Sequence, residues 1–169
     1  MQKPWFKWAF ALVCGVLVVS AASAQTAWPD FMATLTVSVS KSPQKVTLPA
    51  DVKIAQLPAD APADVSRWLG VWSGYACRDF GCDIKVAIEN IEGTAVTLVY
   101  GWANATQVFP AERLSGDAIN GEIRAKLRGG GSLVLRLRAN NAMEMVVLRP
   151  NNQWAIAGVL TKSEAPSRP

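Results

Sequence analysis

The feature that most constrains the fold is the alternation of apolar and polar residues that begins at Gly70 and continues to Lys162. Period-two alternation is the pattern of strands that bury one face. Gly, Asn, Asp and Pro interrupt it about every 8–12 residues, which favours a sandwich or a barrel. Because the turns are tight, sequential strands should be neighbours. The pattern predicts eight strands, at 71–76, 83–91, 95–102, 107–114, 119–127, 133–139, 143–148 and 154–161.

Strand register follows from asking which loop length brings apolar faces together. Around Gly93 a three-residue loop, with Gly93 at a positive φ, aligns three inward-facing pairs. These pairs are Ile84–Trp102, Val86–Tyr100 and Ile88–Leu98. Around Gly130 the same reasoning aligns Ile123–Leu137, Ala125–Leu135 and Leu127–Leu133.

The direction in which the Glu144 side chain points depends on the length of the loop before it. A three-residue loop points Met143, Met145 and Val147 inward and Glu144 toward solvent, whereas a two-residue Asn140-Asn141 turn reverses this. Because a lone buried carboxylate is costly, we prefer the first arrangement.

Pro110 fits poorly in the strand expected at 107–114, because proline cannot donate to a ladder. The sequence leaves two options there, a bulge or a partial opening of the sheet.

The run Gly70-Val-Trp72 resembles the opening of lipocalins and their small relatives. The resemblance covers about 95 residues, 69–162, and implies an all-β, antiparallel, eight-stranded up-and-down barrel. In that family the tryptophan packs at the closed end, beneath a basic side chain from a late strand. Trp72 would take the first role, and Arg149 or Lys162 the second. The domain is shorter than a full lipocalin, so the resemblance implies a small cavity at most.

The residues before Gly70 predict an exported protein with a leader. Lys3, Lys7, an apolar run and Ala22-Ser23-Ala24 are typical of a signal peptide over residues 1–24. We expect periplasmic or extracellular localisation; the alternative is an uncleaved membrane anchor. Residues 25–66 predict a flexible Pro- and Ala-rich leader with one added strand at 34–40 and a short helical turn near Pro62. The barrel domain then spans 67–162, followed by a disordered tail at 163–169.

Cys77 and Cys82 flank four residues between two predicted strands. Facing residues of a hairpin lie within disulfide range, and an exported context permits the bond. We therefore predict a Cys77–Cys82 disulfide. The spacing is not that of a redox or zinc motif.

The sequence argues against an enzyme. None of the 169 residues is His, which removes Ser-His and Cys-His catalysis and the commonest metal ligand. The Gly129–Gly131 run precedes no helix and so is not a phosphate loop. Asp79 and Asp83 could form a carboxylate pair, but turn residues are the simpler interpretation. We expect no cofactor and no metal.

Aromatic residues suggest a binding cup. Tyr100, Trp102 and Trp154 are the candidate ligand-binding residues, since a small barrel can hold one small ligand. The competing interpretation is that these rings fill the core. The leading hypothesis is an extracytoplasmic, non-enzymatic binding module for a small apolar or amphipathic ligand.

A basic hairpin supports the alternative hypothesis. In the register above, five cations face outward, and Arg124 lies opposite Arg136 while Glu122 lies opposite Arg138. They could dock an anionic cell-envelope component, or simply keep the outer face soluble. Removing the signal takes away Lys3 and Lys7 and lowers the net charge from +4 to +2, so charge gives no evidence for nucleic-acid binding. The five cations are Arg124, Lys126, Arg128, Arg136 and Arg138.

Overall fold

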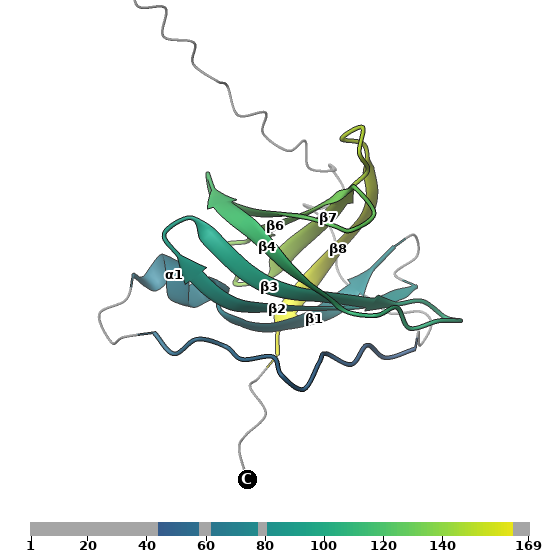
Figure 1. Ribbon diagram of the computed structural model, residues 1–169, viewed down its shortest axis with the longest axis horizontal. Helices are drawn as coiled ribbons and strands as arrows, with labels where there is room; N and C mark the ends of the chain where they lie inside the picture. Colours follow the sequence, from purple (N-terminus) through teal and green to yellow (C-terminus); the bar gives the residue numbers. More distant parts are fainter. Residues whose placement is uncertain (1–43, 58–61, 78–80, 164–169) are drawn as a thin grey trace, which may run out of the picture.

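The computed structural model describes residues 44–57, 62–77 and 81–163, and these form a closed antiparallel β-barrel (Figure 1). Each strand pairs with its sequence neighbours, and β8 returns to pair with β1. This confirms the predicted all-β, eight-stranded up-and-down barrel. The elements are α1 (Ala63–Trp68), β1 (Gly70–Ala76), β2 (Cys82–Glu92), β3 (Ala95–Ala103), β4 (Glu112–Ile119), β5 (Glu122–Lys126), β6 (Ser132–Leu137), β7 (Met143–Leu148) and β8 (Trp154–Lys162).

The register predicted for β2 and β3 is confirmed, but the odd residue is not where the sequence placed it. Ile84–Trp102, Val86–Tyr100 and Ile88–Leu98 are paired as expected, and Gly93 has φ +61°. However, Glu92 pairs with Ala95, so the turn has only two residues, and the register shifts between Ile88 and Asn90. Glu89 is thus the extra residue of a β-bulge, which changes the strand's alternation before the turn is reached.

The register predicted for β5 and β6 is wrong by two residues. Ile123 pairs with Leu135 and Ala125 with Leu133. A shift of two keeps the same side chains inside, so the apolar pattern could not exclude it. It does change the charges that meet outside: Arg136 lies opposite Glu122, and Arg124 lies opposite Val134.

The loop between β6 and β7 has the predicted three residues. The Arg138 amide donates to the Ala142 carbonyl at 2.8 Å, and Asn141 adopts φ +61° within the loop. Met143 and Met145 consequently belong to the barrel core. Glu144 faces outward as expected, although its side chain is buried among the partners described below.

Pro110 lies in the connection between β3 and β4, not within a strand. β4 begins at Glu112, and before it the chain makes a single bridge between Ala103 and Val108. The expected strand at 107–114 was therefore placed too early. The barrel closes without a gap at Pro110.

Large side chains fill most of the barrel interior. Fully buried residues come from strands all around it, so the described barrel has a packed core. Those that belong to this interior cluster include Trp72, Ile84, Ile88, Leu98, Ile123, Leu133, Leu135, Met143, Met145 and Leu160.

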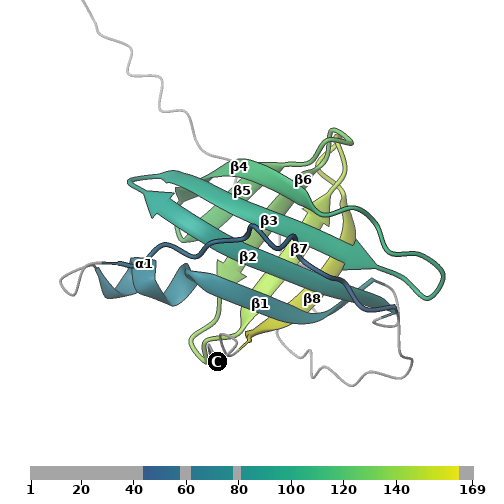
Figure 2. The ribbon, with the colours of Figure 1, turned by 60° about the horizontal axis from the view of Figure 1, so that its bottom comes forward.

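Residues 44–57, here called the strap, lie along the outside of the barrel. Figure 2 shows this segment crossing over β2 and β3. Val46 is fully buried, its amide donates to Asp83 at 2.8 Å, and the Ala55 amide donates to the Glu89 carbonyl at 2.7 Å. This part of the predicted leader is thus hydrogen-bonded to the barrel wall.

The end of the barrel beside α1 is closed by Trp72 and Lys162. The Lys162 ammonium lies 5.3 Å from the Trp72 ring centroid and donates to the Arg67 carbonyl at 3.2 Å. The Trp72 indole donates to the Trp68 carbonyl at 2.8 Å, so both side chains bind the carboxyl end of α1. Burial lowers the pKa of Lys162. Of the two basic residues left open by the sequence, Lys162 is therefore the one above Trp72.

Gly70 is required by the same arrangement. Its φ is +128°, a conformation that favours glycine, and a Cβ there would lie 2.8 Å from Lys162 Cε. This explains why the Gly-x-Trp motif begins with glycine.

Several predictions fall outside the described residues. They are the signal peptide at 1–24, the strand at 34–40 and the tail beyond Ser163. In the part of the chain that is described, no helix has the length and apolar character needed to cross a membrane.

Candidate functional site

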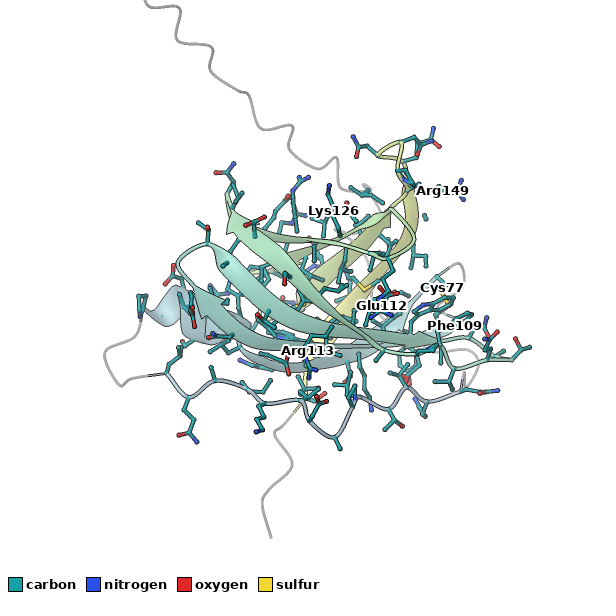
Figure 3. All side chains as sticks on the ribbon, in the orientation of Figure 1. Cys77, Phe109, Glu112, Arg113, Lys126 and Arg149 are labelled. Carbon is teal, nitrogen blue, oxygen red and sulfur yellow. A yellow bond between two sulfur atoms is a disulfide. The ribbon has the colours of Figure 1, made fainter. Side chains whose placement is uncertain are left out.

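The candidate site is a cavity at the barrel end opposite α1. The connections β1–β2, β3–β4, β5–β6 and β7–β8 surround this end. The cavity has a volume of about 290 Å³. Figure 3 shows Cys77, Phe109, Glu112 and Arg149 at this same end. We call it the cup, and its walls are formed by Tyr100, Trp102, Glu112, Leu127, Val147, Arg149, Pro150 and Ile156, with neighbouring loop residues.

Two of the three predicted ligand-binding residues line the cup. Tyr100 and Trp102 face inward from the end of β3. Trp154 begins β8 opposite Leu148, which also lines the cup, but the description of Trp154 is limited to its backbone. The structure thus brings Tyr100 and Trp102 together and gives no side-chain position for the third.

Phe109, in the connection between β3 and β4, supports the aromatic wall. Its ring stacks on Trp102, with centroids 3.8 Å apart and planes inclined by 9°. The Phe109 amide also donates to the Trp102 carbonyl at 3.1 Å. Stacking and a backbone bond together fix the orientation of the Trp102 ring.

Tyr100 is the most buried polar residue of the cup, with 4% of its surface exposed. Burial raises the pKa of its phenol well above the ordinary value, and the negative charge of Glu112 acts in the same direction. Glu112 lies directly opposite Tyr100 in the β3–β4 ladder. The phenol is therefore a neutral hydroxyl at physiological pH.

Glu112 lines the cup and is a residue that the sequence analysis missed. The carboxylate is half-buried, and one oxygen accepts the Arg128 amide at 3.1 Å. The missed signal was its spacing of two from Leu114, a core residue, which puts both on the inner face. The expected strand at 107–114 obscured this spacing, because Glu112 then lay near the end of the strand. In the structure Glu112 begins β4.

Arg149 reaches the cup from the connection after β7. Its amide donates to the Gln153 carbonyl at 2.7 Å, and its carbonyl accepts from Asn152 at 2.9 Å, so the turn holds its backbone. Arg149 is exposed, whereas Glu112 is half-buried. The sequence had offered Arg149 as a partner for Trp72; the structure places it at the opposite end.

The Cys77–Cys82 disulfide is formed, with 5.6 Å between the two Cα atoms. It joins the ends of β1 and β2 on the cup side of the barrel. Cys82 is buried, and Cys77 packs against the core cluster. The predicted cross-link thus secures one of the connections around the cup.

The basic hairpin is largely paired with acidic residues. Arg124 contacts Glu122 at 2.8 Å, and Glu144 accepts from Arg136 at 2.7 Å and from Arg138 at 2.8 Å. Glu122, Arg124 and Arg136 have interactions beyond these. Lys126 and Arg128 form no ion pair within the described segments. The opposed arginines expected from the sequence do not occur, because the register differs by two.

Among the described residues, no group of three or more Cys, Asp or Glu side chains could hold a metal ion. Fold and site together define this protein as a closed antiparallel β-barrel with a small cup at one end. No protein-family model, curated protein or solved structure matches the chain.

Proposed function

We propose that this protein is an exported, non-enzymatic binding module of the lipocalin-like type, which takes one small apolar or amphipathic ligand in the cup. The observation that carries the proposal is the lining of the barrel end opposite α1. There, aromatic and aliphatic side chains form the walls of an open cavity of about 290 Å³ that also contains a few polar groups. A concave, mostly apolar site with a few polar groups is the usual form of a small-molecule pocket.

The cavity limits the size of the ligand. Its volume lies just below the lower bound of about 300 Å³ for typical ligand pockets. Large side chains of the barrel core, among them Trp72, Ile84 and Leu98, are fully buried. The expected ligand therefore has about ten non-hydrogen atoms and a dissociation constant on the order of 0.1 mM.

The lipocalin-like assignment is supported by the closed end. Trp72 lies beneath Lys162, and α1 precedes β1 at that end. This is the arrangement that the Gly-x-Trp resemblance implied. Export is supported by the disulfide, which is typical of oxidising compartments.

The basic hairpin ranks behind the cup as a functional surface. Three of its five cations pair with Glu122 or Glu144, which reduces the positive charge available to an anionic partner. Docking on an anionic envelope component through this face remains the alternative hypothesis.

The proposal is tested by calorimetric titration with the neutral probe 3-phenylpropan-1-ol. We expect saturable binding that is lost in Val147→Trp, because a larger ring would occupy the cup. The smaller change Ile156→Phe should weaken binding. It serves as a second test in case Val147→Trp does not fold. Ile119→Trp is the matched control, since Ile119 is exposed on β4 and does not line the cup.

Saturable binding to the wild type and to Ile119→Trp, with loss in Val147→Trp, supports the cup. Equal binding of the probe to all four proteins would refute it, and so would the absence of wild-type binding both by this probe and by the three charged probes of the next subsection.

A further inference from the structure

Glu112 and Arg149 place opposite charges in one apolar cavity. Both line the cup. They form no ion pair with each other, and Arg149 contacts no carboxylate within the described residues. Each charge therefore remains available to a bound molecule.

The two charged residues differ in depth. Glu112 is half-buried beside Tyr100, whereas Arg149 is exposed. One Glu112 oxygen is held by the Arg128 amide, which fixes the carboxylate in place. A carboxylate held among apolar walls is best stabilised by a cation that also donates hydrogen bonds.

We propose that the cup selects a small zwitterion with an apolar body, such as an amino acid with an aromatic or aliphatic side chain. The geometry points to an ammonium group at Glu112, a carboxylate at Arg149, and an apolar body against Tyr100 and Trp102. This inference rests on the proposed function and narrows it to a ligand class.

Other charges do not reverse this assignment. Lys162 also lies on the inner face, but it closes the opposite end of the barrel above Trp72. The buried carboxylates of Asp83, Glu89 and Glu144 lie on outward positions and are paired with basic side chains. Among the described residues that line the cup, the charged side chains are therefore those of Glu112 and Arg149.

The test compares four probes that share a phenyl ring and a short chain. They are phenylalanine, phenethylamine, 3-phenylpropionate and the neutral 3-phenylpropan-1-ol. We expect phenylalanine to bind most tightly. Glu112→Gln should weaken phenylalanine and phenethylamine roughly tenfold and leave 3-phenylpropionate no weaker. Arg149→Gln should weaken phenylalanine and 3-phenylpropionate roughly threefold, since an exposed cation contributes less.

Matched charge removals serve as controls. Glu92→Gln removes an exposed carboxylate at the α1 end, and Lys126→Gln removes an exposed cation outside the cup. Neither should change the ranking of the four probes. If the wild type binds the neutral probe as tightly as phenylalanine, or if Glu112→Gln leaves phenethylamine unaffected, the zwitterion inference is overturned while the cup stands. If none of the four probes binds, the proposed function itself fails.

Discussion

Inward and outward carboxylates have different partners in this protein. Asp83, Glu89 and Glu144 are buried on the outside of the sheet, and each contacts at least one Lys or Arg side chain. Glu112 faces inward and has a single backbone donor. A carboxylate beside apolar walls is stabilised by an opposite charge, so Glu112 marks the place where a bound cation would be most stabilising.

The ionisation of Tyr100 gives a test of its burial. In the folded protein the pKa of Tyr100 is raised above its unfolded value of about 10. Below that pH the phenol is therefore protonated in both the folded and the unfolded state. Above it the unfolded state loses the phenolic proton first, and stability should fall as pH rises. Absorbance at 295 nm should therefore show one tyrosine that does not ionise until the protein unfolds. Tyr100→Phe should lack that late step.

Tyr75, the second of the two tyrosines in the sequence, provides the internal comparison. If folded wild-type protein shows more tyrosinate than Tyr100→Phe near pH 10, the phenol is accessible and the cup is more open than described.

Residue-level prediction from sequence succeeded where packing decides the answer. The inward positions of Tyr100 and Trp102 follow from alternation, because their strand is anchored by Leu98. Glu112 was missed because the loop before β4 contains Pro110 and hides the start of the strand. Trp72 could be assigned its role, but its basic partner could not be chosen, since only the three-dimensional closure brings Lys162 to it.

At the scale of elements, the strap has no clear sequence signal of its own. Residues 44–57 contain no long alternation, yet Val46 is fully buried and Asp83 and Glu89 both accept strap donors. These contacts lie between residues 36 or 37 positions apart in the chain. Local pattern cannot report them. The strap instead becomes visible only when the outer face of β2 and β3 is known.

Val46 of the strap packs directly over Gly101 of β3. A Cβ at Gly101 would lie 2.8 Å from the Val46 methyl carbon Cγ1. Gly101→Ala should therefore displace Val46 and lower the free energy of unfolding by about 1–3 kcal/mol. Urea denaturation measures this, and limited proteolysis of the strap should become faster.

Gly129→Ala is the control for that substitution. A Cβ at Gly129 meets nothing within 4 Å, so its effect should stay within about 0.5 kcal/mol. Equal stability of both variants would mean that the strap is not packed on Gly101 as described.

Hairpin register shows where element-level prediction stops. The pairing of Ile84, Val86 and Ile88 with β3 was predicted correctly although the turn has two residues, because the bulge at Glu89 supplies the odd residue expected in the loop. Between β5 and β6 the Gly129–Gly131 run accommodates several loop lengths. A slip of two residues leaves the same face inside, so burial does not oppose it. The consequence is electrostatic, because the shift exchanges an arginine pair for Glu122 opposite Arg136.

At the scale of the whole molecule, closure of the sheet removes its edges. β1 pairs with both β2 and β8, so its backbone groups are bonded on both sides. The eight-strand repeat predicts this architecture from sequence, because short strands with tight turns favour a meander. The size of the cup was not predictable, since it depends on how far rings from different strands fill the interior.

The disulfide adds a constraint to a barrel that is already closed by hydrogen bonds. Cys77 and Cys82 are five residues apart, so the cross-link restricts only a short loop of the unfolded chain. Loop-closure entropy then predicts a loss of about 2 kcal/mol in Cys77→Ser/Cys82→Ser. Seven residue pairs still join β1 to β2 without it. The double variant should therefore melt at a lower temperature but keep its far-UV circular dichroism spectrum. Weaker binding of 3-phenylpropan-1-ol by this variant would show that the β1–β2 connection shapes the cup. Loss of the β spectrum at 25 °C would instead show that the barrel requires the cross-link to close.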